Sequence, residues 1–186
     1  MKIYTIIPIL SIFILSGFAQ DKLPDESHSN ENQEVRNSIE WYDFESVQNL
    51  SNNTDKKYFI YVYTNSCPWC RRMSSTSFQN KEIIDLLNTK FIPVKFNADS
   101  QETILFRDYE FKYISNSRNG YHQLAASLLN NKLVYPSIVF LDKEMKMIQA
   151  LSGYKKAKDL SIILHYLGDK IYETMSFDEY QEKIEQ

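Results

Sequence analysis

Residues 58–73 read Tyr-Phe-Ile-Tyr-Val-Tyr-Thr-Asn-Ser-Cys-Pro-Trp-Cys-Arg-Arg-Met and contain the only two cysteines of the chain, Cys67 and Cys70. The aromatic and β-branched run 58–63 is typical of a buried strand, and a short polar turn follows it. A helical pattern begins at the cysteines. Pro68 suits its first turn, because the ring presets φ and the missing N–H would have no partner inside the helix. The stretch therefore predicts a strand, a turn and a helix that starts at the cysteines.

This predicted helix start has a chemical consequence for Cys67. Free N–H groups and the positive end of the helix dipole would point at its sulfur, and both stabilise thiolate over thiol. Arg71 and Arg72 add positive charge, which solvent screens. Cys70 lies one turn further along, close enough for a disulfide and more shielded. Cys67 is therefore the candidate attacking thiolate and Cys70 the candidate resolving thiol.

Two other roles for the cysteine pair compete with redox chemistry. A structural disulfide would close a very small loop and would stabilise the fold little. A zinc site needs about four ligands, whereas the chain offers one cysteine pair and three scattered histidines, His28, His122 and His165. Redox chemistry is the favoured interpretation. We accordingly expect no metal and no cofactor beyond a redox-active Cys67–Cys70 disulfide.

Composition and charge limit the class of protein and its partners. The chain has 186 residues, 14% of them aromatic, and only 4 glycines, which is typical of one tightly packed domain with short additions. The net charge is −3, and no basic patch with interleaved aromatic residues is visible. Nucleic acid is therefore not an expected partner. We expect a monomer.

The N-terminal residues predict export. Lys2 precedes an apolar run, Ile3–Phe18, and small residues end at Ala19, so residues 1–19 are expected to be a signal peptide cleaved after Ala19. An uncleaved anchor is the alternative. Residues 20–38 are polar and predict a disordered linker, followed by a folded domain over 39–186. The expected location is periplasmic or otherwise exported. There, a single pair of closely spaced cysteines is more typical of a redox-active site than of a structural disulfide.

The pattern before position 120 predicts the first half of the domain. Asp43 is expected to cap a short helix, and Asn80 a second one with an apolar face. Residues 91–96 alternate as a strand. Residues 100–119 form an insertion in which 103–106 and 109–114 predict a β-hairpin. A packed irregular loop is the alternative for this segment.

The pattern after Gly120 predicts helices around two strands. Apolar residues at helical spacing begin at Tyr121 and place His122 on the polar side. Residues 137–141 and 145–151 are β-type runs joined by a turn. A long helix follows, with its apolar stripe over 160–171 and His165 beside that stripe. Ser176 begins a capping box, which predicts a last short helix to about residue 185.

This order of elements resembles the thioredoxin superfamily over residues 39–172. Three motifs carry the resemblance: Ser66-Cys67-Pro68-Trp69-Cys70, Tyr135-Pro136-Ser137, and Gly153 after the last strand. The chain looks more closely like exported thioredoxin-fold proteins of Bacteroidetes-type bacteria with a Cys-Pro-Trp-Cys site. The fold class that this implies is α/β and thioredoxin-like, a central mixed β-sheet flanked by helices. We expect two additions to this fold: an inserted β-hairpin before the third helix and an extra C-terminal helix.

The resemblance implies roles for residues around the cysteines. Tyr135–Pro136 would be a cis peptide bond facing the disulfide, which X–Pro bonds adopt at low cost. From the residues alone, Pro136 equally suits a trans bond at a strand start. The Tyr135 backbone would then pair with a substrate peptide, supported by Pro68, Trp69 and Lys95. An aromatic rim of Trp69 and Tyr135 would select partners.

The insertion offers three more rings, and their role is open. Tyr109, Tyr113 and Tyr121 either extend the aromatic rim or fill the core.

The sequence departs from the thioredoxin pattern at positions that matter for proton transfer. Thioredoxins bury an Asp where this chain has Tyr61, so Lys95 lacks the partner that it has in that family. A buried Tyr is a poor base at neutral pH. Deprotonation of Cys70 must then be helped by Lys95, water or another carboxylate. The Trp that precedes the first Cys in thioredoxins is Ser66 here.

The function expected from these residues is thiol–disulfide exchange with protein thiols and disulfides. A reductase or general oxidoreductase is favoured, which in an exported protein requires a membrane electron donor. The alternatives are a disulfide oxidase or isomerase, and a non-catalytic peptide-binding or chaperone module with a permanently closed disulfide.

Overall fold

The structure is a computed structural model, and it describes residues 37–48, 50, 54–115 and 120–185. The predicted signal peptide, residues 1–19, lies outside the described residues. So does all of the predicted linker except residues 37 and 38. The described residues all belong to one compact unit of the chain.

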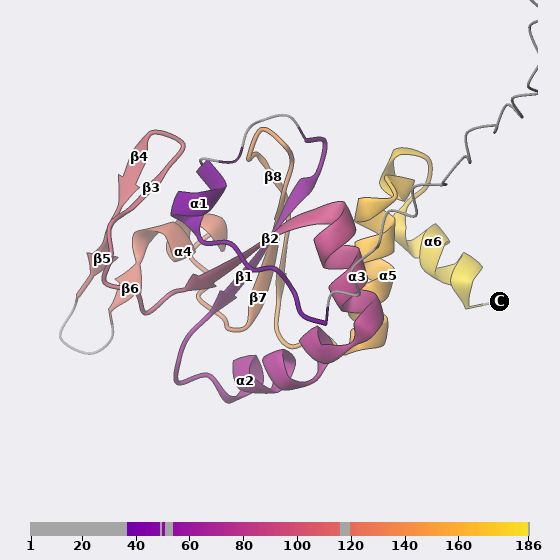
Figure 1. Cartoon of the computed structure of the whole chain (residues 1–186), viewed down its shortest axis with the longest axis horizontal. Coiled ribbons are helices and arrows are strands. Elements are labelled where there is room, and N and C mark those ends of the chain that lie inside the picture. The colour runs from indigo at the N-terminus through magenta and orange to yellow at the C-terminus, as the bar shows by residue number, and fades with distance from the viewer. Residues whose placement is uncertain (1–36, 49, 51–53, 116–119, 186) are drawn as a thin grey trace, which may run out of the picture. The chain divides into compact units, whose positions relative to one another are not determined.

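A four-stranded mixed sheet forms the centre of the domain (Figure 1). Its strands lie in the order β2, β1, β7, β8, with β1 and β2 parallel and the other pairs antiparallel. Their bounds are β1 Lys57–Tyr63, β2 Phe91–Asn97, β7 Ser137–Leu141 and β8 Met147–Ser152. The strands predicted at 58–63, 91–96, 137–141 and 145–151 are confirmed within two residues at each end.

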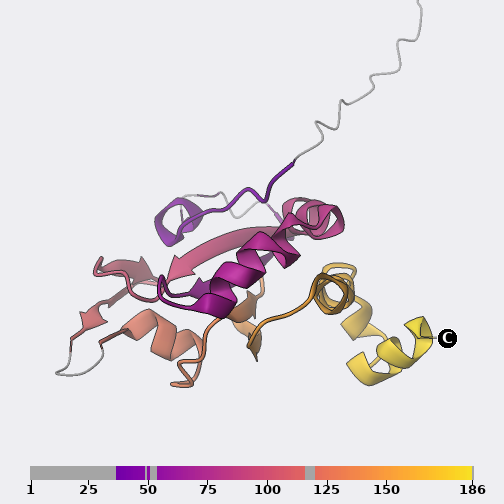
Figure 2. The same cartoon turned by 90° about the horizontal axis from the view of Figure 1, so that it is seen from below.

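Helices cover both faces of this sheet (Figure 2). The α-helices are α1 Phe44–Gln48, α2 Pro68–Ser75, α3 Lys81–Lys90, α4 Gln123–Leu128, α5 Ala157–Gly168 and α6 Phe177–Ile184. Short 3₁₀ turns occupy Ser77–Gln79 and Ile171–Glu173. The thioredoxin-like fold class with its C-terminal helix is confirmed. No helix in the described ranges has the length and apolar character needed to cross a membrane.

Alternation along β1 separates two cores, because successive side chains of a strand point to opposite faces. Phe59 and Tyr61 pack with α2, α3 and α5, whereas Tyr58, Ile60 and Val62 pack with α1 and α4. All five are at most 5% exposed. A strand buried on both faces is what the unbroken aromatic and β-branched run predicted.

Three predicted helix caps are present. The Asp43 carboxylate accepts from the Ser46 N–H at 2.7 Å, and the Asn80 side chain accepts from the Ile83 N–H at 3.2 Å. Ser176 and Glu179 form the reciprocal capping box at the start of α6. Each cap pairs N–H groups that the first turn of a helix leaves without intrahelical partners.

The insertion contains the predicted hairpin and a second small ladder. Strands β3, Ile104–Phe106, and β4, Tyr109–Phe111, are antiparallel. The expectation of one strand over 109–114 was wrong, because the backbone of Lys112 pairs with Gln123 at the start of α4. Beyond Lys112, β5, Tyr113–Ile114, pairs with β6, Tyr121–His122.

His122 corrects the expectation of a solvated side chain on a helix. It is 0% exposed, and its Nδ1 accepts from the Leu124 N–H at 3.1 Å, which makes it the N-cap of α4. Its Nε2 lies 3.0 Å from the Glu102 carbonyl oxygen in the insertion. The helix therefore starts at Gln123, two residues later than the apolar spacing predicted.

Helix α5 also ends earlier than its predicted stripe, at Gly168 rather than near Ile171. A Cβ at Gly168 would lie 3.1 Å from side-chain atoms of Lys90 and Phe91, so α5 packs closely against the end of α3 there. Lys170 then takes a left-handed conformation, φ 58°, which ends the helical path. His165, on the last turn of α5, is half-exposed and lies 2.8 Å from Asp169.

Candidate redox site

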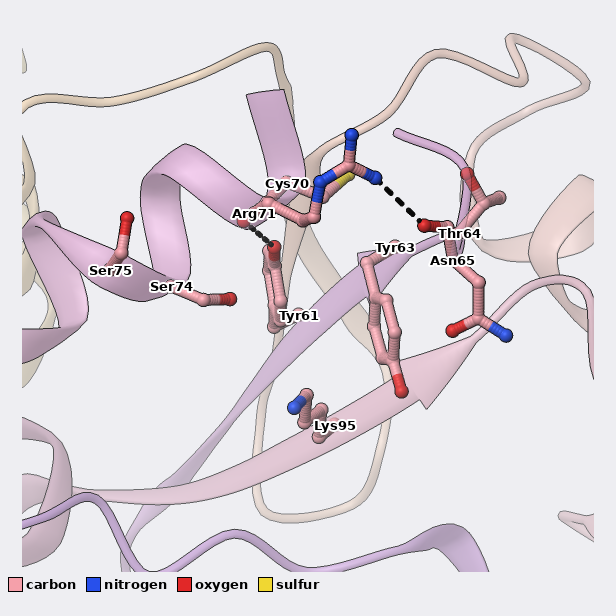
Figure 3. A pocket seen from close by; sticks show the side chains of 9 residues that line it. All are labelled: Tyr61, Tyr63, Thr64, Asn65, Cys70, Arg71, Ser74, Ser75 and Lys95. Atoms are coloured by element: carbon pink, nitrogen blue, oxygen red, sulfur yellow. Dashed lines mark hydrogen bonds between the residues drawn. The ribbon is translucent and has the colours of Figure 1, made fainter. Parts of the chain in front are cut away.

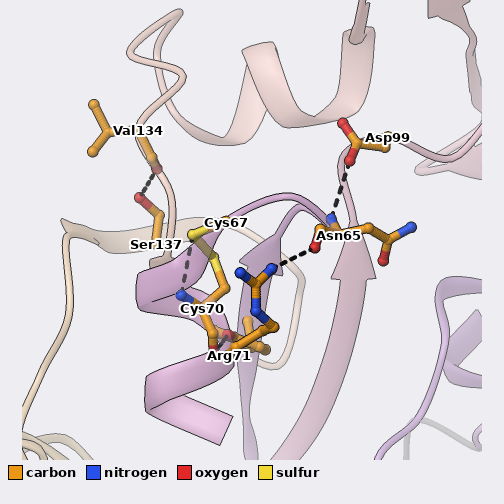
Figure 4. The surroundings of a disulfide bond; sticks show 8 residues. Asn65, Cys67, Cys70, Arg71, Asp99, Val134 and Ser137 are labelled. Atoms are coloured by element: carbon orange, nitrogen blue, oxygen red, sulfur yellow. Dashed lines mark hydrogen bonds between the residues drawn. A yellow bond between two sulfur atoms is a disulfide. The ribbon is translucent and has the colours of Figure 1, made fainter.

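Cys67 and Cys70 form a disulfide at the start of α2, with their Cα atoms 5.2 Å apart. Cys67 is the N-cap of this helix and Pro68 its first residue, so the predicted helix start is confirmed. The Cys70 N–H donates to the Cys67 sulfur at 3.1 Å (Figure 4). Cys67 is half-buried, whereas Cys70 is 2% exposed. One sulfur therefore meets solvent and receives an N–H, and the other lies behind it.

Backbone and side-chain hydrogen bonds hold the turn before Cys67. The Arg71 guanidinium donates to the Asn65 carbonyl oxygen at 3.0 Å, and the Asn65 N–H donates to Asp99 at 3.1 Å (Figure 4). The Cys67 N–H donates to the Thr64 carbonyl oxygen at 3.3 Å. These bonds tie the end of β1, the turn and α2 together. The position of the Cys67 sulfur is thus set by several elements.

Tyr61, on β1, is hydrogen-bonded to the backbone of helix α2. Its side chain is 1% exposed, and its hydroxyl donates to the Cys70 carbonyl oxygen at 3.0 Å (Figure 3). Burial raises the pKa of Tyr61, so the phenol stays protonated at neutral pH. The sequence identified Tyr61 as a poor base, but its bond to the backbone of the resolving cysteine has no signature in the sequence.

Lys95 lies on β2 in register with Tyr61 of β1. Its side chain is exposed, and its Nζ lies 5.0 Å from the centre of the Tyr63 ring. Lys95 and Cys70 both line a pocket of about 450 Å³ between α2 and the sheet (Figure 3). The structure therefore brings Lys95 to the same side of the site as the resolving cysteine.

Trp69 projects from the dipeptide between the cysteines and is 53% exposed. Its ring lies 5.7 Å from that of Tyr154, and the Arg72 guanidinium lies 5.3 Å from Trp69 and 5.5 Å from Tyr154. The Tyr154 and Thr76 hydroxyl oxygens are 3.2 Å apart, and this hydrogen bond is the main cause of a lowered Tyr154 pKa. Sequence reasoning missed Tyr154, although it directly follows Gly153.

The segment before β7 carries the candidate peptide-binding residues. The Tyr135–Pro136 bond is cis, Pro136 is buried and Tyr135 is half-buried. The Ser137 hydroxyl donates to the Val134 carbonyl oxygen at 2.6 Å across this bond, and both residues lie in the surroundings of the disulfide (Figure 4). The Gly153 N–H donates to the Pro136 carbonyl oxygen at 2.7 Å. Burial raises the pKa of Tyr135 to about 12.

The insertion tyrosines differ in their surroundings. Tyr109 is 73% exposed and packs against Phe111, with ring centres 6.2 Å apart. Tyr113 and Tyr121 are half-buried. Tyr113 also lies close enough to Tyr135 to add to its raised pKa. Of these three rings, the exposed Tyr109 does not fill the core.

A metal site would require several His, Cys, Asp or Glu side chains to converge. Across the described ranges, no group of three or more His, Cys, Asp and Glu side chains is arranged to hold a metal ion. His122 and His165 lie in different parts of the domain, on hydrogen bonds already described.

The sheet, the helices around it and the cysteine pair define a protein of the thioredoxin-fold class with a Cys-Xaa-Xaa-Cys pair at disulfide distance. The chain belongs to the family Thioredox_DsbH, described as "Protein of unknown function, DUF255", whose model matches residues 20–162.

Solved structures share the fold at low sequence identity. A thioredoxin-fold protein from Helicobacter pylori is 22% identical with a TM-score of 0.53, and the match covers 70% of this chain and 81% of that one. A DsbH oxidoreductase is 16% identical with a TM-score of 0.50, over 75% of this chain and 91% of the other.

Curated relatives match over a smaller part of their length. Spermatogenesis-associated protein 20 from Rattus norvegicus is 30% identical over 73 residues, which is 39% of this chain and 9% of the relative. An uncharacterized protein from Caenorhabditis elegans is 27% identical over 116 residues, 61% of this chain and 16% of that protein. The chain thus spans less than a fifth of the length of these relatives.

Proposed function

We propose that this protein is a thiol–disulfide oxidoreductase that exchanges disulfides with protein substrates. The observation that carries the proposal is the asymmetry of the cysteine pair. Cys67 is half-exposed at the N-terminus of α2 and receives the Cys70 N–H, whereas Cys70 is 2% exposed. A helix N-terminus and a hydrogen-bond donor both favour the thiolate form of the outer cysteine.

The exchange proceeds in two steps once the pair is reduced. The Cys67 thiolate attacks one sulfur of a substrate disulfide, so that a mixed disulfide forms and the other substrate sulfur leaves as a thiolate. Cys70 then loses its proton and attacks the Cys67 sulfur. The second substrate thiolate leaves, and the Cys67–Cys70 disulfide is formed. Two electrons pass from the cysteine pair to the substrate, and the reverse sequence oxidises a dithiol.

The substrate peptide is proposed to bind beside Tyr135. The ladder between β1 and β7 begins at Ser137, so the Tyr135 N–H and C=O lie outside it. Backbone groups at such a position suit an added peptide strand. Pro68 and Trp69 are exposed beside the half-buried Cys67 and complete the proposed surface, while the buried Pro136 joins Tyr135 to β7.

We propose the reductase or general oxidoreductase direction for this exchange. Cys-Xaa-Xaa-Cys proteins span potentials from about −120 to −270 mV, and the Pro-Trp dipeptide favours an intermediate value. The predicted signal peptide supports action in the periplasm or another exported location, where a membrane electron donor must return electrons to the pair. A redox titration against glutathione ranks the pair between reductases and oxidases.

A trapping experiment tests the assignment of the two cysteines. In Cys70→Ser the mixed disulfide has no resolving thiol, so substrate accumulates covalently on Cys67. In Cys67→Ser no adduct forms, and reduction of insulin disulfides is lost. Mass spectrometry under non-reducing conditions measures both. Equal trapping by the two variants would contradict the assignment of Cys67 as the attacking thiolate. Partner binding that survives in Cys67→Ser without any exchange would instead identify a binding module.

The acidity of Cys67 is a second test. In the reduced protein, the thiolate absorbance near 240 nm is expected to rise well below the value of about 8.5 for free cysteine, because the helix N-terminus and the Cys70 N–H stabilise the anion. A pH titration of wild type against Cys67→Ser isolates this signal. A midpoint at the value of free cysteine contradicts a tuned nucleophile.

A further inference from the structure

The pocket beside Cys70 has a volume of about 450 Å³ and opens between α2 and the strands β1 and β2 (Figure 3). Cys70 is part of its wall, and so are Thr64 and Asn65, which precede Cys67. A group that enters the pocket therefore lies next to Cys70 and the turn that precedes Cys67, while Cys67 itself is not part of the lining. The lining side chains that carry polar hydrogen atoms include Tyr61, Tyr63, Thr64, Arg71, Ser74 and Lys95.

The charges of this pocket all have one sign. Its lining holds two cationic side chains, Arg71 from α2 and Lys95 from β2, and the Arg71 guanidinium is turned towards the Asn65 carbonyl oxygen (Figure 3). Within the described part of the chain, no carboxylate contributes to the lining. Asp99 is tied to this region, but it accepts from the Asn65 N–H at 3.1 Å and is not part of the wall.

Both cations keep hydrogen-bonding capacity for a ligand. Arg71 donates one bond, to the Asn65 carbonyl oxygen at 3.0 Å, out of the five N–H groups of a guanidinium. Lys95 lies over the Tyr63 ring, a contact that leaves the ammonium N–H groups available. Two cations that line one hollow of the surface attract an anion more strongly than either does alone.

Because the pocket lies beside a cysteine pair proposed to exchange disulfides with proteins, the anion that binds there is expected to belong to a protein substrate. Apart from thiolates, the negative charges of a protein substrate lie chiefly on its Asp and Glu side chains. A carboxylate accepts from guanidinium, ammonium and hydroxyl donors, all of which this lining presents.

We propose that the pocket is a subsite for a substrate carboxylate, an Asp or Glu side chain next to the cysteine that exchanges with Cys67. This rests on the proposed function and names the class of protein substrate: disulfides with an acidic flanking residue. The subsite acts on binding, because the carboxylate takes no part in the sulfur chemistry. Its effect therefore falls on KM more than on kcat.

Three disulfide-linked peptides that differ only in one residue beside the cysteine, Asp, Asn or Lys, test the subsite. With the reduced wild-type protein, kcat/KM for the Asp peptide is expected to exceed that for the Asn peptide about fivefold, the effect of one partly exposed ion pair of about 1 kcal/mol. In Lys95→Gln and in Arg71→Gln the Asp-to-Asn ratio falls towards one. Both side chains are exposed, so both variants are expected to fold.

Lys146→Gln is the matched control, since Lys146 is exposed in the turn after β7, at the opposite end of β1 from Cys67. It is expected to keep the wild-type ratio. Salt at 0.5 M, by screening the pair, is expected to reduce the ratio in wild type about as far as either variant does.

Each contrary outcome has a distinct meaning. Equal kcat/KM for the Asp and Asn peptides in wild type overturns the subsite and leaves the exchange activity intact. A preference that survives in both variants overturns its location in this pocket. A preference for glutathione disulfide over its ethyl ester, with no preference among the peptides, overturns the peptide assignment in favour of a small disulfide. Failure to exchange with every peptide overturns the proposed function itself.

Discussion

At the scale of single residues, two buried polar rings connect separate elements of the fold. Tyr61 donates to the backbone of Cys70, and His122 joins the start of α4 to the carbonyl group of Glu102. Both rings are almost fully buried, and both have hydrogen-bond partners. Buried polar groups need such partners, because leaving one unpaired costs about 1–3 kcal/mol.

Replacement of His122 by Ala is therefore expected to destabilise the fold. The change removes a helix cap, leaves the Glu102 carbonyl oxygen without this partner and opens a cavity, for a loss of about 2–4 kcal/mol in the free energy of unfolding. Urea denaturation measures it. His165→Ala is the matched control, because this half-exposed ring makes ion pairs near the surface and is expected to cost less than about 1 kcal/mol. Equal losses in the two variants would contradict a structural role for His122.

At the scale of elements, the turns that join short strands carry local strain. The β3–β4 hairpin turns at Arg107 and Asp108, whose φ values are 51° and 63°. Positive φ at both central residues is typical of the two-residue turn that Asn-Gly favours. A residue with a Cβ is conformationally strained at positive φ, whereas Gly is not.

The double substitution Arg107→Asn with Asp108→Gly is expected to stabilise the protein by about 1 kcal/mol, because it relieves this conformation at two exposed positions. The thermal unfolding midpoint should rise by several degrees. As a control, Asp142→Gly removes a carboxylate that accepts from the Lys146 N–H at 2.8 Å in another turn, and it should lower the midpoint. An unchanged midpoint in the hairpin variant would show that the turn stores no strain.

At the scale of the whole domain, burial of tyrosines links stability to alkaline pH. Burial raises the pKa of several tyrosines, with Tyr135 reaching about 12. The others raised chiefly by burial are Tyr58, Tyr61, Tyr63, Tyr172 and Tyr180. The unfolded chain loses these protons near pH 10, while the folded chain keeps them. Above that pH the folded state binds more protons, so the free energy of unfolding falls as pH rises.

Stability measured with urea is therefore expected to decline steadily from about pH 10 towards 12. The lowered pKa of buried Lys57 acts in the opposite sense, but only below its unfolded value of about 10.4. Tyr135→Phe should make the free energy of unfolding fall less steeply with pH, since it removes the tyrosine whose pKa is raised to about 12 in the folded state. Tyr109→Phe, at a ring that is 73% exposed, should leave the slope unchanged. A slope that neither variant alters would assign alkaline unfolding to other groups.

Much of the redox site could be predicted from the sequence because its determinants are local. The strand, the turn and the helix start at Cys67 follow from neighbouring residues, and so do the caps at Asp43, Asn80 and Ser176. The hairpin was predictable for the same reason. The break at Lys112 was not, since it depends on Gln123 across the insertion.

The sequence by itself determined where each main element lies, which cysteine begins a helix and which follows a turn later, because periodicity and capping act over a few residues. Only the tertiary structure decided that Tyr61 reaches the Cys70 carbonyl group, that His122 is buried, and that Arg71 and Lys95 line one pocket. The Tyr61 bond spans nine residues, and the other contacts join segments further apart in the chain. Their geometry depends on how the strands and helices pack, which local propensities do not encode.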